Sequence, residues 1–400
     1  MSFDPDTVRT GCAALVQALP SIEWITDSRV ERLSQDFYWY SPVLKRQLDR
    51  VTAEAIVTPR DEAEILRVVK ACHRHRVPLT VRGGGTGNYG QAMPLRGGIV
   101  LDLAELTAIG EISHGRVRVA AGRKLAELDA ATIAHSRQEL RLHPSTHKTG
   151  TVGGYVAGGS SGIGSITWGL LRDRGNILAA RVVTMEAEPR ILEFRGPDIL
   201  KVAHAYGTNG IIVEAEMPLT AAYDWVDVIV GFDSPLAAVA FGEQAARQDG
   251  LLLKEIAPVA APMPYDWFNR HRPYLKGRDQ SVVLIMAAPA SVPALIDLVS
   301  FHNADLVFRS DTIDPEERKK LPPVYELAWN HTTLRGLKID PGITYLQTQY
   351  PDLAHVKWAI DTFGDEMPMH IEMNRFDGRI IFSGLPVVRY TTEERLEEIM

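Results

Sequence analysis

The chain has 400 residues, of which 45% are hydrophobic and 23% are charged, and its formal net charge is -7. This length exceeds the roughly 250 to 300 residues at which one hydrophobic core stops growing, so we expect two domains. Lys and Arg are scattered and form no basic stripe, which argues against a nucleic-acid partner and favours a small-molecule substrate. Cys12 and Cys72 are the only cysteines, which excludes a disulfide framework.

The sequence predicts neither a secretory signal nor a transmembrane segment. Its first residues, MSFDPDTVRTGC, lack the apolar stretch of a signal peptide, so we expect a cytoplasmic protein. The apolar run at 282–299 is interrupted by Pro289, Ser291, Pro293 and Asp297, well short of the ~20 apolar residues that span a bilayer. It predicts a strand followed by a helix.

Regular patterning starts at AIVTP (55–59), which predicts a strand, and Asp61 then caps a helix with Ile65, Val68 and Cys72 at helical spacing. Further strands are predicted at 77–81, 98–103 and 116–122, and an amphipathic helix at 124–136. Residues 144–169 are rich in Gly, Ser and Thr and show no steady period, which is typical of a functional loop. Strands at 177–186 and 210–219 then enclose a predicted helix at 198–207.

Beyond residue 223 the pattern alternates between strands and helices. Strands are predicted at 225–232, 251–258 and 281–289, and helices at 234–248 and 291–302. This alternation predicts an α+β domain with helices on one face of an antiparallel sheet. We therefore divide the chain into domains 1–222 and 223–400.

Two glycine clusters in the first domain carry the strongest chemical signal. Gly83, Gly84, Gly85, Thr86 and Gly87 end a predicted strand, where backbone N–H groups can converge on phosphate oxygens. The spacing matches neither GxGxxG nor a P-loop, and a flexible loop is the alternative for such a cluster alone. A second cluster, TVGGYVAGGSSG at 151–162, favours one extended dinucleotide that crosses both loops.

Several ordered motifs resemble the FAD-binding PCMH-type domain, the flavin module of glycolate and D-lactate oxidising enzymes, vanillyl-alcohol oxidase and p-cresol methylhydroxylase. They are RGGGTGNYGQAMP, GIVLDL, VAAG, PSTHKTGTVGGYVAGGSSG, WG and GTNGIIVEAEMPL, and together they cover about residues 53–220. The resemblance implies an α+β chain with a two-part FAD-binding domain over 1–222, followed by a substrate (cap) domain over 223–400.

The resemblance also implies which residues hold the cofactor, in three groups. The pyrophosphate loop is Gly83, Gly84, Gly85, Thr86, Gly87 and Asn88; the flavin and ribityl contacts are Pro144, Ser145, Thr151, Gly153, Gly154, Ser161 and Gly162; and the closing strand is Gly210, Ile211 and Ile212. For the last three, the alternative is an ordinary buried strand.

Some relatives attach the flavin to a His of the first loop or a Cys of the second. Here the first loop offers Thr86 and Asn88, and no cysteine follows Cys72, so we expect non-covalent FAD. His143 and His147 flank the second loop, and we interpret both as polar loop histidines.

Oxidising an alcohol carbon needs a proton acceptor, for which His is the commonest side chain. The candidates are His331 in ELAWNHTTLRGLK and the pair His370 and Glu372 in PMHIEMNRFDG, where period 2 also puts Asn374 on the same strand face. Such a pair could share a proton or bind a divalent metal. The alternatives are a satisfied core histidine at His331 and a solvated strand face at 370–374.

Two departures from the family qualify the interpretation. The GDGNxH stretch that holds metal in the hydroxy-acid branch is absent, which leaves the metal undetermined. The chain also stops at TTEERLEEIM without the family's usual NPGK-like segment, so we expect either a truncated chain or one lacking that segment. Upstream, aromatic residues 37–40 favour a packing cluster over a wall of the substrate pocket.

The expected function is therefore an FAD-dependent oxidation of a small alcohol or 2-hydroxy acid, with an electron acceptor that the sequence does not identify. The flavin would accept a hydride at its N5 atom. The alternatives are a flavin-binding subunit that passes electrons to a partner and an NADPH-dependent reductase on the same FAD fold.

Overall fold

The computed structural model describes residues 4–400, which divide into two compact units. The first unit runs to Ser160 and resumes over Leu171–Ala222, and the second comprises Ser161–Leu170 and Tyr223–Met400. Residues 161–170 fall in the second unit because Gly164 N–H donates to Lys254 O (2.7 Å) and Thr167 Oγ1 donates to Leu253 O (2.6 Å).

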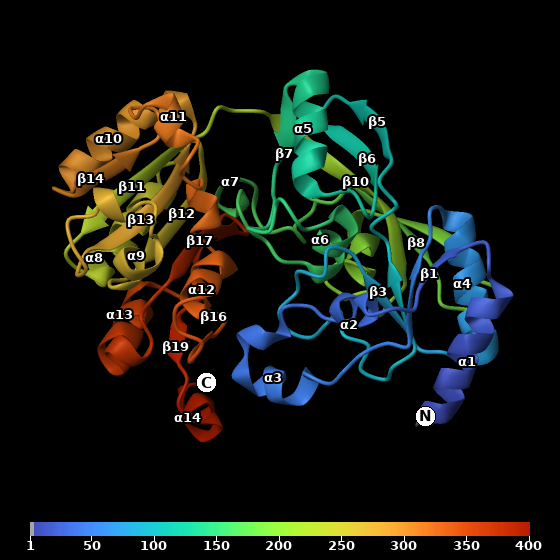
Figure 1. Ribbon diagram of the computed structural model, residues 1–400. Helices are drawn as coiled ribbons and strands as arrows, with labels where there is room; N and C mark the ends of the chain where they lie inside the picture. Colours follow the sequence, from blue (N-terminus) through green and yellow to red (C-terminus); the bar gives the residue numbers. More distant parts are fainter. Residues whose placement is uncertain (1–3) are drawn as a thin grey trace. The chain divides into compact units, whose positions relative to one another are not determined.

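The first unit contains a mixed sheet and a larger antiparallel sheet (Figure 1). Its strands are β1 (Glu23–Ile25), β2 (Ala55–Thr58), β3 (Leu79–Arg82), β4 (Ile99–Asp102), β5 (Ile109–Ser113), β6 (Arg116–Ala120), β7 (Gln138–Leu140), β8 (Ala179–Val183), β9 (Ile191–Arg195) and β10 (Ile211–Ala221). Its helices are α1 (Pro5–Ala18), α2 (Arg29–Leu33), α3 (Pro42–Leu48), α4 (Glu62–His75), α5 (Leu125–Ser136) and α6 (Val152–Gly158), with 3-10 turns η1 (Tyr38–Tyr40) and η2 (Gly196–Lys201).

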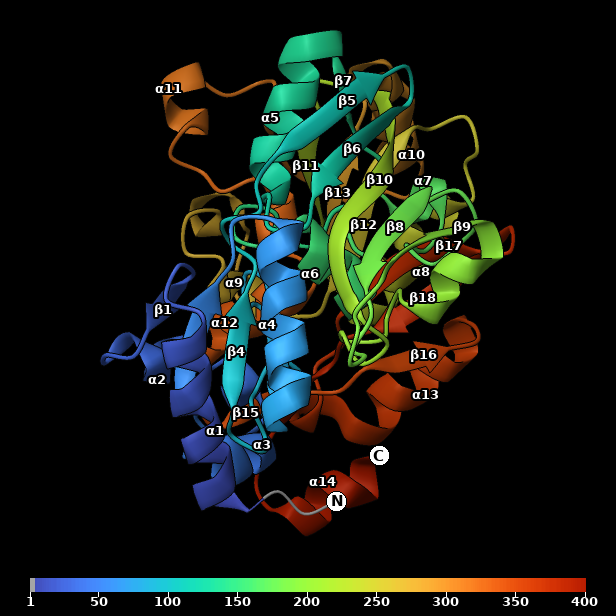
Figure 2. The same cartoon turned by 90° about the vertical axis from the view of Figure 1, so that its right-hand side faces the viewer.

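The two sheets of the first unit place the glycine loops at strand ends. The smaller sheet has the order β1-β2-β4-β3, in which β2 and β3 run parallel to β4. In the larger sheet, long β10 lies between β6 and β8 (Figure 2), and β7 also pairs with β10. Asp61 caps α4 as predicted, its carboxylate accepting from Glu64 N–H, and the apolar face of α4 is buried through Ile65, Val68 and Cys72.

Two segments of the first unit differ from the sequence prediction. Residues 152–158 form helix α6, which Thr151 caps and whose Val152, Tyr155 and Val156 are buried. The helix predicted at 198–207 is wrong, because only the 3-10 turn η2 forms there. Past that turn, His204 N–H donates to Val156 O (3.0 Å) and Tyr206 N–H to Ala157 O (3.0 Å), so these amides cap α6 instead of continuing a helix.

The second unit is built around antiparallel strands. Its strands are β11 (Val226–Phe232), β12 (Leu253–Val259), β13 (Ser281–Ala287), β14 (Asp305–Arg309), β15 (Ile343–Tyr345), β16 (Thr348–Tyr350), β17 (Ile371–Phe376), β18 (Arg379–Gly384) and β19 (Val387–Arg389). Its helices are α7 (Ser165–Trp168), α8 (Pro235–Ala246), α9 (Met263–Trp267), α10 (Val292–Phe301), α11 (Pro315–Arg318), α12 (Asn330–Leu337), α13 (Leu353–Phe363) and α14 (Glu393–Ile399), with 3-10 turns η3 (Arg272–Tyr274), η4 (Pro289–Ser291), η5 (Val324–Glu326) and η6 (Gly364–Glu366).

The main sheet of the second unit has the order β12-β13-β11-β14, with every pair antiparallel. β16, β18 and β17 form a separate three-stranded sheet, and a bridge between Val259 and His370 joins β12 to the start of β17. β11, β12 and β13 are buried along their whole length, with α8 packed against all three. Over residues 4–400, no helix is both long and apolar enough to cross a bilayer.

Candidate functional site

The two glycine loops meet within the first unit. A Cβ on Gly83 would lie 2.2 Å from Thr151 Oγ1, and a Cβ on Gly84 would lie 2.3 Å from the carbonyl oxygen of Thr149. Real Cβ atoms do not come this close, so the second loop can pack directly against the first only because Gly83 and Gly84 carry no side chain. The contact joins segments some 70 residues apart.

Residues before the family-like region hold the first loop in place. Arg82 Nη1 donates to Gln35 O (2.6 Å), Phe37 N–H donates to Gly87 O (2.6 Å), and Ala92 N–H donates to the Asp36 carboxylate (3.2 Å). Tyr38 and Tyr40 are buried beside these contacts. The aromatic segment therefore packs as a cluster and also anchors the loop through main-chain atoms.

The second loop carries the other polar residues of the predicted cofactor set. Ser145 and Thr151 are buried, and Thr151 Oγ1 accepts from Gly154 N–H (3.2 Å). His147 Nε2 bonds to Asp129 Oδ2 (2.7 Å), and its ring lies 4.3 Å from that of His143.

The remaining predicted cofactor residues are distributed differently. Ile211 and Ile212 are buried strand residues of β10, paired with Val183 and Val182 of β8, and Gly210 precedes them with a φ of 129°. Ser161 and Gly162 belong to the segment that packs in the second unit. The structure thus brings together the loops at 83–88 and 144–154 and sets 210–212 in the sheet core.

A buried polar cluster lies in the second unit, and it contains two of the predicted catalytic residues. His370 Nε2 lies 2.7 Å from Glu372 Oε1, and the two side chains are 0% and 1% exposed. The alternative of a solvated strand face is therefore wrong: the sequence pattern could not show that β12 packs beside β17 and covers it. Asn374 is also buried and donates to Ser383 Oγ (2.8 Å).

Two further residues complete this cluster, and the sequence analysis missed their part in it. Trp329 N–H donates to Glu372 Oε1 (2.6 Å), and its indole Nε1 donates to Glu255 Oε2 (3.3 Å). Trp329 has φ 52° and ψ -145°, an uncommon backbone conformation for a bulky residue. A sequence signal for Glu255 does exist: it is a carboxylate inside the apolar strand LLLKEIAP.

The electrostatics of the cluster follow from its burial. Burial raises the pKa of Glu372 to about 7 and raises that of Glu255 well above its ordinary range, while burial lowers the pKa of His370 to about 3. The His370 ring is therefore neutral at neutral pH. Within residues 4–400, His370 Nδ1 and Glu372 Oε2 are buried atoms without a hydrogen-bond partner.

The other sequence candidates occupy different positions. His331 lies in the first turn of α12, half-buried, next to Asn330, whose Oδ1 is buried without a partner among residues 4–400. Arg375, which follows Asn374 on β17 and was not among the catalytic candidates, donates to Ile166 O, Ala246 O and Asp249, so its guanidinium has a structural role. No group of three or more His, Cys, Asp or Glu side chains in the described part of the chain is arranged to hold a metal ion.

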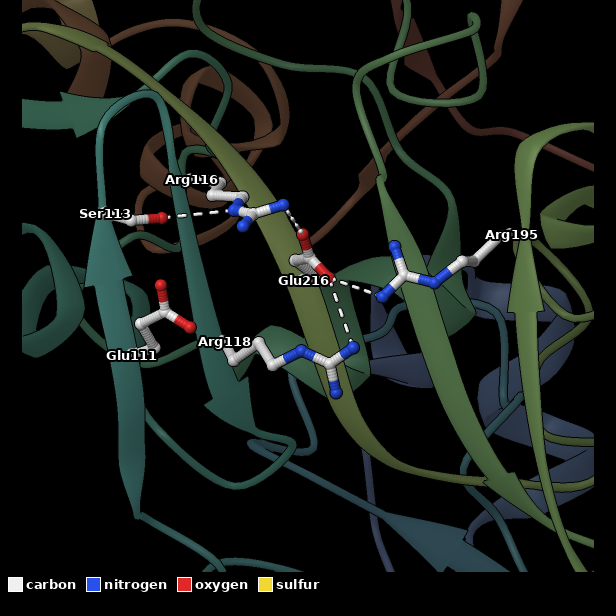
Figure 3. Close-up of a pocket in the computed structure, with 6 residues that line it drawn as sticks. All are labelled: Glu111, Ser113, Arg116, Arg118, Arg195 and Glu216. Atoms are coloured by element: carbon white, nitrogen blue, oxygen red, sulfur yellow. Dashed lines mark hydrogen bonds and ion pairs between the residues drawn. The ribbon is translucent and has the colours of Figure 1, made fainter.

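A second charged site lies on the large sheet of the first unit. Glu216, on β10, is surrounded by Arg116, Arg118 and Arg195 in a hollow of about 120 Å³ (Figure 3). The shortest of these ion pairs joins Arg195 Nη2 to Glu216 Oε2 at 2.8 Å. Every cation there faces a carboxylate, so the hollow is a structural ion-pair network.

Comparison with known proteins bears on the first unit. The family model described as an FAD binding domain matches residues 53–193. The first unit contains an FAD-binding domain. Within this FAD-binding domain, the lack of side chains at Gly83 and Gly84 is the feature that suits a pyrophosphate, because backbone N–H groups can then approach its oxygens closely.

Curated relatives match part of the chain. The chain is 31% identical over 162 residues to D-lactate dehydrogenase of Archaeoglobus fulgidus and 28% identical over 174 residues to glycolate oxidase subunit GlcD of Bacillus subtilis. These matches cover 40% and 42% of this chain but only 35% and 37% of the relatives' lengths. The similarity therefore covers less than half of this chain and less than half of either relative.

Solved structures extend the likeness to the fold of nearly the whole chain. Alkyldihydroxyacetonephosphate synthase matches with a TM-score of 0.73 and 16% identity, covering 97% of this chain and 78% of its own. p-Cresol methylhydroxylase matches with a TM-score of 0.69 and 11% identity, covering 98% and 86%. The predicted α+β fold of PCMH type is confirmed.

Proposed function

We propose that the protein is an FAD-linked oxidoreductase that oxidises a small alcohol or 2-hydroxy acid. The observation that carries the proposal is the pairing, in one chain, of an FAD-binding domain with a buried His370–Glu372 pair whose Nδ1 atom is free to accept a proton. The names of the two curated relatives, a D-lactate dehydrogenase and a glycolate oxidase subunit, support a hydroxy acid as substrate.

The FAD-binding residues are proposed to be those of the two loops and the adjacent strand. Gly83, Gly84 and Gly87 would leave room for the pyrophosphate, and Thr151, Gly153 and Gly154 would contact the flavin side of the cofactor. The lack of side chains at Gly83 and Gly84 supports this assignment, since it lets the two loops pack together and keeps side chains away from the backbone N–H groups that would bind phosphate oxygens. We propose that binding is non-covalent because the loops at 83–88 and 151–162 offer no His or Cys.

The second unit is proposed to supply the proton acceptor. When bound, FAD provides a hydride acceptor for the alcohol carbon. As that carbon is oxidised to a carbonyl, the hydroxyl proton would pass to His370 Nδ1. Glu372 holds Nε2 of the same ring at 2.7 Å and stabilises the imidazolium that forms.

The direct test is anaerobic mixing of the purified protein with a panel of 2-hydroxy acids and phenolic alcohols, followed at the yellow absorbance band of the flavin. Bleaching by one substrate class supports the proposal and identifies the class. A flavin that stays oxidised with every compound, yet bleaches with NADPH, would favour a reductase instead.

Cofactor attachment is tested by precipitating the protein with acid or heat. Yellow colour in the supernatant is expected for non-covalent FAD, whereas colour in the pellet would contradict it.

Gly84→Val tests the loop contact. Because its Cβ would meet the Thr149 carbonyl oxygen, the substitution should separate the loops and abolish flavin retention. Gly250→Ala is the matched control, because no heavy atom lies within 4 Å of the added Cβ. A folded Gly84→Val protein that keeps its full colour would exclude this loop as the phosphate site.

A further inference from the structure

The carboxyl groups of Glu255 and Glu372 approach each other in the buried cluster of the second unit. Trp329 bonds to both of them, through its main-chain N–H to Glu372 Oε1 (2.6 Å) and through its indole N–H to Glu255 Oε2 (3.3 Å). Two neighbouring buried carboxyl groups do not readily ionise together, so one of them keeps its proton. Glu372 Oε1 already accepts from Trp329 N–H and contacts His370 Nε2, whereas Oε2 has no N–H donor within residues 4–400. Oε2 is therefore the atom left for a proton on Glu255.

The identity of the protonated partner follows from the number of donors. Glu372 faces the Trp329 amide and the His370 ring, which stabilise its ionised form, whereas Glu255 receives only the longer bond from the Trp329 indole (3.3 Å). Burial acts on both carboxyls and raises the pKa of each. The proton therefore stays on Glu255.

Within residues 4–400, no Lys or Arg is among the groups that shift the pKa values of the two carboxyl groups. The pKa shifts of Glu255, His370 and Glu372 come from burial, from one another and from Trp329. The other ionisable side chains on β12, β17, β18 and α8 are occupied or exposed: Lys254 lies over the Trp225 ring, Arg375 bonds to carbonyl oxygens, Glu243 pairs with Arg247, and Arg379 is exposed. β13 and α7, which also pack here, carry none.

We propose that Glu255 is a positioning acid that keeps its proton and donates it to Glu372, so that Glu372 remains a carboxylate and holds His370 with Nε2–H toward it and Nδ1 free as the acceptor. This inference rests on the proposed function, because a free Nδ1 matters only if His370 accepts the substrate proton. Glu255 itself acts through Glu372 and is not a catalytic residue. Without its donor, Glu372 would hold a proton and donate it to Nε2, and Nδ1 would then carry the ring hydrogen.

The test compares Glu255→Gln with Glu255→Leu in the full-length flavin-loaded protein. The Gln side chain retains an N–H donor toward Glu372, whereas Leu retains only bulk. Nuclear magnetic resonance of 15N-labelled histidine reports the His370 ring tautomer without substrate, and stopped-flow reduction by the best substrate of the panel reports activity. His370→Ala identifies the His370 signal.

Wild type and Glu255→Gln are expected to hold the hydrogen on Nε2 at pH 7. Glu255→Leu should move it to Nδ1 and slow flavin reduction about 10- to 100-fold, the scale of losing a hydrogen bond to a charged group. It should also shift the pH midpoint of reduction upward. An unchanged tautomer in Glu255→Leu, or a Gln variant that behaves like Leu, would overturn the inference.

The tautomer readout separates this inference from the proposed function. If Glu255→Leu changes the tautomer but no substrate reduces the flavin of the wild type, the positioning role stands and the oxidase assignment fails. If Glu255→Leu does not fold, the Gln variant still tests the inference. Loss of the Nε2–H tautomer in a folded Gln variant would contradict the role of residue 255 as a neutral hydrogen-bond donor to Glu372.

Discussion

Two buried carboxylates, Glu216 in the first unit and Glu372 in the second, have opposite surroundings. Glu216 is 4% exposed and contacts three arginines at 2.8–3.4 Å (Figure 3). Glu372 is 1% exposed and contacts His370 and the Trp329 amide, with no Lys or Arg among the groups that shift its pKa. Burial alone therefore does not distinguish a structural carboxylate from one that is proposed to take part in proton transfer.

The difference lies in how each charge is balanced. The hydrogen bond to Glu216 raises the pKa of Arg195, so protons in this network stay where they are at any physiological pH. Burial without a cation instead brings the pKa of Glu372 to about 7, where a proton can move during catalysis. The first arrangement suits stability and the second suits proton transfer.

The strongest test of this contrast is His370→Ala. Because the proposed acceptor atom is removed, flavin reduction by substrate should slow ~100-fold or more, while FAD content stays unchanged. Stopped-flow reduction at matched flavin occupancy measures the effect. His355→Ala is the control, since His355 is exposed and bonds only to nearby Asp352. Equal rates for wild type and His370→Ala would make His331 the next acceptor to test.

The second test is the pH dependence of flavin reduction. Glu372 must be ionised to stabilise the imidazolium, and its pKa is raised to about 7, so the rate should be constant well above pH 7 and fall about tenfold per unit below it. Glu372→Gln should remove this limb and lower the rate throughout. A wild-type profile that is flat between pH 5 and 9 would mean that Glu372 does not titrate in the reaction.

The smallest expected effect concerns Glu216, the carboxylate that is paired with three arginines. Glu216→Gln leaves three partly exposed arginines without their shared partner. It should cost about 1–3 kcal/mol of folding free energy, a loss between that of an exposed salt bridge and that of a buried one. Thermal unfolding measures the loss, while reduction rates should not change. Glu188→Gln, which disrupts an exposed pair with Lys70, should have almost no effect. A slower reduction in Glu216→Gln would contradict a purely structural role.

Much of the fold could be predicted because local patterns agreed with the final packing. The N-cap at Asp61 and the fully buried strands at 226–232 and 281–287 lie where their sequences placed them. The structure of residues 198–207 could not be predicted from local sequence patterns, because the main-chain N–H groups of His204 and Tyr206 donate to carbonyl oxygens of α6. Helix α6 could not be predicted from its sequence either, because its glycines lower helix propensity. The helix is stabilised by the Thr151 cap and by burial of Tyr155, together with the bonds from residues 204 and 206.

The candidate site was predictable only in part. His370 and Glu372 share a face through period 2, which the sequence shows. Their burial and the approach of Glu255 depend on β12 lying beside β17, and the two strands are more than 100 residues apart in sequence. Trp329 contributes through its amide, a group that no side-chain motif reveals. Contacts between distant strands and bonds from the main chain were therefore what the sequence could not supply.

The anchoring of the first glycine loop by Gln35, Asp36 and Phe37 sets a practical lower limit on the flavin-retaining fragment. The family match starts at residue 53, yet these bonds to Arg82, Gly87 and Ala92 come from residues upstream of it. A recombinant fragment trimmed to the family boundary should therefore leave that loop loose and lose colour on gel filtration. Limited proteolysis that cuts between residues 40 and 53 should likewise bleach the protein before its sheets unfold.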